Sequence, residues 1–175
     1  MVKLFHPKKT SPRLDRLHEL SLFVNLTQAE LQIVDGLLHE RQYLEGEVIF
    51  DEGEEGQAIY FIVSGEVLIF RQELADVRRA AQDDVNPAAE PLPRRRQGDT
   101  GRVAQLGPGT FFGELALLDN SPRSAQARAA SPCQLIVFFR DDFVGLLDTH
   151  ARIASKISRQ LACHLGTRVR AWHSQ

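Results

Sequence analysis

The chain has 175 residues, of which 43% are hydrophobic and 25% charged, so it can form one globular domain with appendages and is too apolar for a disordered protein. Its net charge of -2 at pH 7 excludes a global basic field that would attract nucleic acid. The N-terminal residues lack an apolar signal segment, and no run is long enough to span a bilayer. We therefore expect a cytoplasmic protein without membrane contact.

Two short helices are predicted before the first strand. Ser11 and Pro12 form an N-cap and first-turn pair, and we expect residues 1–21 to form a helical leader. Thr27 and Glu30 form a capping box that opens the second helix. The apolar positions at helical spacing are Leu14, Leu17 and Leu20 in the first helix and Leu31, Val34, Leu37 and Leu38 in the second.

The pattern changes to strands at Tyr43. Short β-branched and aromatic runs follow, separated by turn residues: VIF, AIYFIV, EVLIF, RVAQL and QLIVFF. Ser64 and Gly65, between AIYFIV and EVLIF, predict a hairpin. Residues 22–140 are therefore expected to form a β-roll, interrupted by a loop inserted at 71–102, which is rich in charge, Ala and Pro and poor in large apolar residues.

The last segment, 141–175, is predicted to be helical. Phe143, Leu146 and Leu147 share one short helical face. A stripe at steps of four follows in a longer helix, formed by Ile153, Ile157, Leu161 and Leu165. The expected fold class is α+β: a jelly-roll β-sandwich with N-terminal helices and a long C-terminal helix that could also support a homodimer.

Metal and thiol chemistry are not indicated. The six histidines have no metal-ligand spacing, and the HxH pair with a downstream Glu that a metal-dependent cupin enzyme needs is missing. Cys133 and Cys163 have no CxxC spacing, which favours free, buried thiols. We expect neither a metal nor an enzyme.

The stretch FGELALLDNSPRSAQARA contains one acid and one base in an unusual setting. A turn of helix after Gly113 presents backbone N–H groups, and Arg123 follows Pro122 and can reach back to the same place, which favours an anion. The small residues Ser124, Ala125 and Ala127 allow a ligand to approach the backbone closely. Glu114 fits beside a singly charged ligand if it meets a neutral hydroxyl, as in a 3′,5′-cyclic nucleotide. The alternative is a salt bridge between Glu114 and Arg123 that only fixes the turn.

Two segments, GEVIFDEGEEGQAIYFIVSGEV and LGPGTFFGELALLDNSPRSAQARA, followed by a helical tail, resemble the cyclic-nucleotide-binding domain of bacterial catabolite activators, cyclic-nucleotide-regulated channels and kinase regulatory subunits. The resemblance implies cAMP or cGMP as ligand. It places Glu114 on the ribose 2′-hydroxyl and Arg123 on the phosphate, with a hydroxyl added by Ser124. The implied binding residues are Phe112, Gly113, Glu114, Leu115, Ala116, Arg123, Ser124 and Ala125.

The resemblance leaves the base and the output open. Gln126 stands where the family more often has Thr, Val or an aromatic residue. Thr167, Arg168 and Trp172 could close over the base as a lid. No helix-turn-helix, channel or kinase sequence follows the last helix, so we expect a sensor with a separate protein partner and no direct DNA binding. The alternative is a related fold that has changed ligand or serves as a protein-interaction scaffold.

Overall fold

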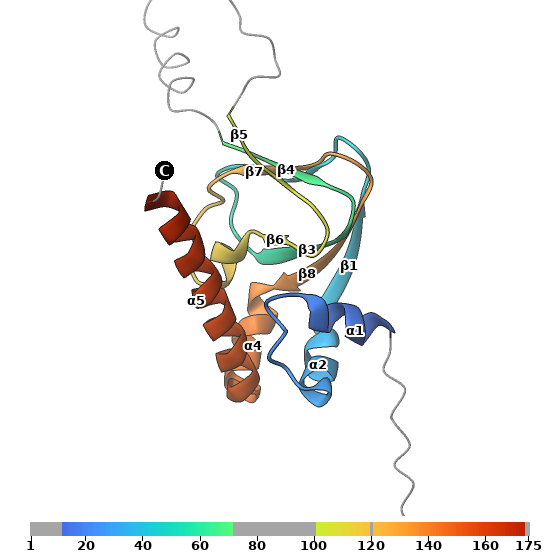
Figure 1. The fold of residues 1–175 in the computed structure, drawn as a ribbon, viewed down its shortest axis with the longest axis vertical. Coiled ribbons are helices and arrows are strands. Elements are labelled where there is room, and N and C mark those ends of the chain that lie inside the picture. Colours follow the sequence, from blue (N-terminus) through green and yellow to red (C-terminus); the bar gives the residue numbers. More distant parts are fainter. Residues whose placement is uncertain (1–11, 72–100, 120, 174–175) are drawn as a thin grey trace, which may run out of the picture. The chain divides into compact units, whose positions relative to one another are not determined.

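The computed structural model describes residues 12–71, 101–119 and 121–173, which fall into two compact units. The helical unit combines Met1–His39 with Phe138–Gln175, and the β unit is Glu40–Val137. Figure 1 identifies their elements along the chain. The domain boundaries expected after residues 21 and 140 stay predictions.

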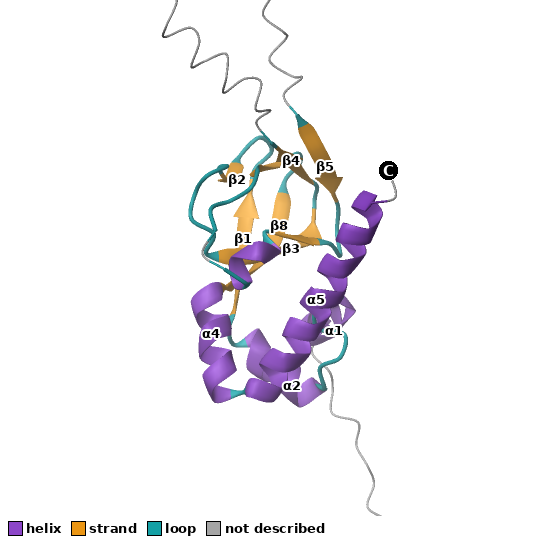
Figure 2. Cartoon of the chain, turned by 90° about the vertical axis from the view of Figure 1, so that its left-hand side faces the viewer, coloured by secondary structure: helices purple, strands orange, loops and turns teal. Residues whose placement is uncertain are grey.

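Amphipathic spacing and capping explain the helices of the helical unit. These are α1 (Pro12–Glu19), α2 (Gln28–Asp35), α4 (Arg140–Thr149) and α5 (Ala151–His173), drawn in purple in Figure 2. The predicted capping box is present, because the Thr27 side chain accepts from the Glu30 N–H and Glu30 accepts from the Thr27 N–H. The residues buried on the predicted faces are Leu14, Leu17, Leu20, Leu31, Val34, Phe143, Leu146, Ile153, Ile157 and Leu161.

Three local expectations about side chains and helix length are wrong. Helix α2 ends at Asp35 with Gly36 as its cap, so Leu38 begins strand β1 (Leu38–Tyr43) instead of continuing the helix to Tyr43. Spacing alone could not show this, because Leu37 and Leu38 continue the helical period. Leu147 is 43% exposed, and Cys163 is exposed on α5, whereas Cys133 is buried.

Glu30 joins α2 to α5 as well as capping α2. Its carboxylate accepts two hydrogen bonds from Lys156 Nζ, at 2.9 and 2.7 Å. The hydrogen bond from Lys156 is the largest influence on Glu30, followed by the one from Thr27, and together they lower its pKa from 4.5 to about 2. A carboxylate with a depressed folded pKa stabilises the fold above its unfolded pKa and loses that contribution as the pH falls.

We therefore expect Glu30→Gln to lower the free energy of unfolding by roughly 1 kcal/mol near neutral pH. The difference from the wild type should shrink as the pH falls from 4.5 toward 2. Urea unfolding at several pH values measures both quantities. The matched control is Glu45→Gln, which changes an exposed carboxylate of the β unit. A difference that stays constant down to about pH 3 would contradict the linkage.

The β unit is built from two antiparallel four-stranded sheets, ordered β1-β8-β3-β6 and β2-β7-β4-β5. The strands that follow β1 are β2 (Val48–Phe50), β3 (Ala58–Ser64), β4 (Val67–Phe70), β5 (Arg102–Leu106), β6 (Phe111–Phe112), β7 (Gln126–Ala129) and β8 (Cys133–Phe139). The inner faces share one core that includes Phe50, Ile62, Val67, Phe112 and Leu135. The predicted β-sandwich with flanking helices is confirmed.

The predicted hairpin at Ser64 and Gly65 is wrong, because β3 and β4 belong to different sheets. Gly65 has φ +85°, and a Cβ there would clash with the Pro132 carbonyl oxygen and lie 2.7 Å from Cys133 Sγ. The glycine is therefore needed where the chain crosses from one sheet to the other beside the start of β8.

The expected insertion lies outside the described residues except at its ends. There the Arg71 N–H donates to the Gly101 carbonyl at 3.1 Å. The interpretation of residues 71–102 as an inserted loop therefore stays a prediction. Within the described ranges, no helix is long and apolar enough to cross a membrane.

Candidate functional site

The turn of the FGELAL stretch follows strand β6 directly. Gly113 has φ +75°, and Glu114–Leu117 form one turn of 3-10 helix, as the sequence predicts. Ala116 packs so closely on Gly56 that a Cβ on the glycine would lie 3.1 Å from the Ala116 Cβ. Glu114 is only 4% exposed. Close packing thus fixes the turn and its carboxylate within the β unit.

Arg123 is held in place by its own backbone. Its N–H donates to the Glu54 carbonyl at 2.7 Å, and its carbonyl accepts from the Gly53 N–H at 2.9 Å. Pro122 forms an isolated antiparallel bridge with Glu55. The acidic loop after β2 therefore sets the position from which the Arg123 side chain enters the β unit.

The Arg123 guanidinium reaches the glycine turn, as predicted. It donates to two carbonyl oxygens, from Nη1 to Gly113 at 3.2 Å and from Nη2 to Ala58 at 2.9 Å. Neither acceptor is a carboxylate, so these bonds do not correspond to the alternative of a salt bridge with Glu114. Arg123 is nevertheless only 8% exposed.

Burial of this cation is costly and points to an anionic ligand. Burial is the main influence on Arg123 and lowers its pKa, while Tyr60 and Glu54 oppose the shift and Glu114 does so to a smaller extent. Among the residues that the structure describes, the buried Nε finds no hydrogen-bond acceptor. A phosphate oxygen would satisfy this donor and compensate the charge.

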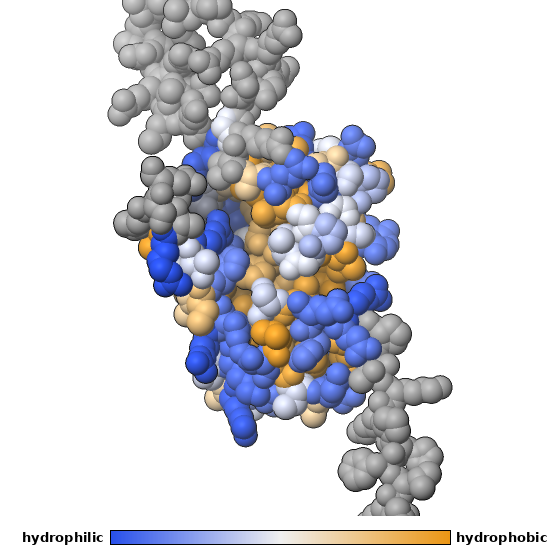
Figure 3. Space-filling model, in the orientation of Figure 1, coloured by the Kyte–Doolittle hydropathy of each residue, from blue (hydrophilic) through white to orange (hydrophobic). Residues whose placement is uncertain are grey.

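The other expected binding residues have different environments. Phe112 and Ala116 are buried, and Ala125 is half-buried. Ser124 is exposed, and its carbonyl accepts from Arg71 Nε at 3.2 Å. Leu115 is 44% exposed, so its side chain faces away from the core. Figure 3 shows that hydrophobic residues reach the surface among hydrophilic ones in the view it draws.

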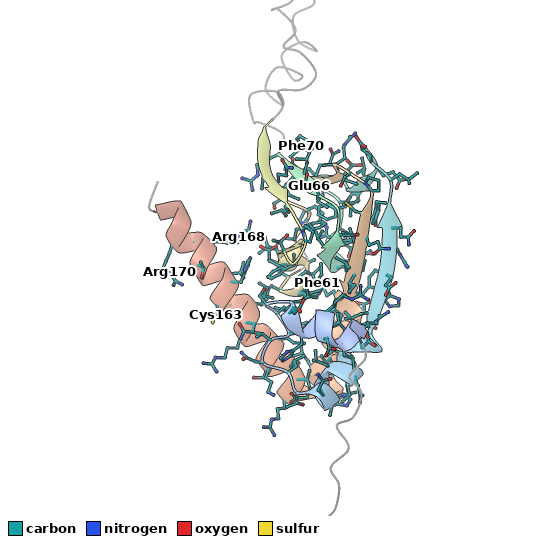
Figure 4. The ribbon with its side chains drawn as sticks, turned by 45° about the vertical axis from the view of Figure 1, so that its right-hand side comes forward. Phe61, Glu66, Phe70, Cys163, Arg168 and Arg170 are labelled. Carbon is teal, nitrogen blue, oxygen red and sulfur yellow. The ribbon has the colours of Figure 1, made fainter. Side chains whose placement is uncertain are left out.

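The expected lid residues lie on the last turns of α5. Thr167 donates to the Cys163 carbonyl at 3.0 Å and accepts from Arg170 at 3.4 Å. Arg168 is exposed, and Figure 4 shows Arg168 and Arg170 leaving the helix on opposite sides. The side chain of Trp172 lies outside the described residues. The lid stays a prediction.

A family model described as the cyclic nucleotide-binding domain matches residues 93–150, which contain the glycine turn and Arg123. The cyclic AMP receptor protein of Thermus thermophilus is 32% identical over 144 residues. This chain belongs to the cyclic-nucleotide-binding domain family. The alignment with the Thermus protein covers 82% of this chain and 56% of that relative, so the chain spans about half of it.

Other members of the cyclic-nucleotide-binding family are also similar to this chain, in sequence or in structure. The cAMP-dependent protein kinase regulatory subunit of Mycosarcoma maydis is 33% identical over 114 residues, 65% of this chain and 17% of that protein. The solved structure of a cyclic nucleotide-binding domain from Methylobacillus flagellatus has a TM-score of 0.71. It is 20% identical and covers 91% of this chain and 79% of its own, which supports the fold.

Sequence reasoning missed the groups that hold Arg123 in this cyclic-nucleotide-binding domain. These are the rings of Phe50 and Tyr60 and the carbonyls of Glu54 and Ala58. The signal that could have found the rings is an aromatic residue at the end of VIF, directly before the acidic loop, and another in AIYFIV. Backbone carbonyls carry no sequence signal.

Proposed function

We propose that the domain binds a purine 3′,5′-cyclic nucleotide, cAMP or cGMP, as a regulatory module. The observation that carries the proposal is the buried Arg123 guanidinium whose Nε has no acceptor among the described residues. A cyclic phosphate brings one negative charge to this cation. The relatives' names, a cyclic AMP receptor protein and a cAMP-dependent kinase regulatory subunit, support the ligand class.

Calorimetric titration with cAMP and with cGMP tests the proposal. We expect saturable binding of at least one nucleotide and a higher melting temperature, since a ligand at a hundred times its Kd adds about 2.7 kcal/mol to the stability of the native state. The control is 5′-AMP, which carries more negative charge and lacks the ring phosphate. No binding of either cyclic nucleotide would refute the proposal and favour a changed ligand or a protein-interaction scaffold.

Glu114 is proposed to accept a hydrogen bond from the ribose 2′-hydroxyl. Glu114→Gln should weaken binding by about 1–2 kcal/mol, because an amide oxygen still accepts but without charge assistance. The 2′-deoxy nucleotide removes the same contact from the ligand side. It should therefore lose little further affinity in the variant, as calorimetry would show. Fully additive losses would mean that Glu114 does not contact this hydroxyl.

The end of α5 is proposed to act as the lid through Thr167, Arg168 and Trp172. Ligand binding can shift the placement of this helix only if the ligand contacts its two placements differently. A chain truncated after Gly166 should therefore fold, as judged by circular dichroism, and bind the nucleotide more weakly. Equal affinity of the truncated and full chains would show that the helix end is no lid. A homodimer through α5 and a downstream protein partner are further proposals.

A further inference from the structure

The Arg123 guanidinium lies among aromatic rings of the β unit. Its Cζ is 4.0 Å from the centroid of the Phe50 ring and 5.6 Å from that of Tyr60. Phe112 stacks on Tyr60 at 5.3 Å with an angle of 11° between the ring planes. A cation within about 6 Å of a ring centroid is attracted by the negative face of the ring. We call Phe50, Tyr60 and Phe112 the aromatic cradle.

The cradle is anchored in both sheets. Phe50 lies on β2, whereas Tyr60 and Phe112 are paired neighbours on β3 and β6 of the other sheet. Phe50 and Phe112 are also members of the buried core, with 8% and 4% of their surface exposed. Because these rings are packed on several sides, they cannot turn away from Arg123 without disturbing the core.

The cradle stabilises the cation through ring faces that carry no net charge. A carboxylate paired with Arg123 would compete with an anionic ligand, because it already supplies the opposite charge. Aromatic faces and carbonyl oxygens stabilise the guanidinium through a quadrupole and dipoles and leave its full charge in place. Nη1 and Nη2 each donate to a carbonyl, whereas the buried Nε has no hydrogen-bond partner among the described residues.

We propose that Phe50 and Tyr60 are positioning residues for Arg123, which hold the guanidinium plane in one orientation so that its Nε–H is ready for a phosphate oxygen. The inference rests on the proposed function for its ligand. The cradle itself is a property of the free protein and can be tested without ligand.

The first test weakens the ring face without removing the ring. Phe50 is replaced by mono-, di- and trifluorinated phenylalanine, which progressively withdraws the negative charge of the face at nearly constant size. Titration with cAMP and cGMP should show affinity falling at each step, by about three- to thirty-fold in total. The matched control is the same series at Phe61, a fully buried residue of β3 whose ring pairs with Phe111 at 5.8 Å (Figure 4). Equal trends at both positions would overturn the proposal.

The second test observes Arg123 directly by NMR. A ring so close to the guanidinium should shift the Arg123 Nε–H signal, which is assigned by its loss in Arg123→Lys. We expect Phe50→Leu to move this signal and Phe61→Leu to leave it in place. A signal that does not respond to Phe50→Leu overturns the cradle. If the wild type binds neither nucleotide, the proposed function fails, and this ligand-free signal alone decides whether the cradle orients Arg123.

Discussion

Arg123→Ala is expected to weaken binding of the cyclic nucleotide by about 2–5 kcal/mol, measured by calorimetry. The guanidinium is 8% exposed, donates to the Gly113 and Ala58 carbonyls and keeps one buried N–H without an acceptor among the described residues. Truncation removes the positive charge that would meet the phosphate and leaves that phosphate in a partly desolvated place without its partner. The loss should therefore be large.

Two further variants separate the charge from the geometry. Arg123→Lys keeps a positive charge but loses the planar fork, so its affinity should lie between those of the wild type and the alanine variant. Arg128→Ala is the matched control, because Arg128 lies on β7 and donates to the Gly46 carbonyl at 3.4 Å instead of to the glycine turn. Unchanged affinity in both Arg123 variants would exclude this arginine from the site.

The strands of the fold could be predicted because their signal is local. Runs such as AIYFIV and QLIVFF are β-branched, aromatic and bounded by turn residues, and they became β3 and β8. Strand pairing is not local. Ser64 and Gly65 have the composition of a hairpin turn, yet they cross between sheets, because β4 pairs with β5 and β7, which both lie further along the chain, and not with β3. A side chain at Gly65 would clash with the carbonyl oxygen of Pro132, and no local sequence pattern indicates that Pro132 lies there.

The candidate site also has one part that is local in sequence and one part that is not. The stretch from Phe112 to Ser124 could be recognised because the glycine turn, Glu114 and Arg123 are close in sequence. The support for Arg123 comes from the segment between Phe50 and Tyr60, which pairs with it only in the folded chain. The sequence therefore identifies Arg123 as the candidate phosphate-binding cation, but it does not indicate which groups stabilise this cation where it is buried.

Gly113→Ala is expected to impair both stability and binding. The residue has φ +75°, where a side chain costs about 1–2 kcal/mol. An added Cβ would also lie 2.6 Å from Arg123 Nη1 and 3.2 Å from the Ala58 carbonyl oxygen. The guanidinium must therefore move away from the Gly113 carbonyl, and the charge-assisted bonds that orient it would be lost. We expect binding weaker by about 1.5–3 kcal/mol in calorimetry, with the loss of stability measured by urea unfolding.

Gly109→Ala separates backbone strain from the close approach. Gly109 has φ +81°, but a Cβ there meets no heavy atom within 4 Å among the described residues. This variant should therefore show the cost of the left-handed backbone in urea unfolding and leave nucleotide affinity near that of the wild type. The difference in nucleotide affinity between the two glycine variants then measures how much the close approach of Arg123 to Gly113 contributes to binding. Equal affinities of the two glycine variants would mean that the guanidinium can move aside for a methyl group without effect, and its fixed position would then not contribute to nucleotide affinity.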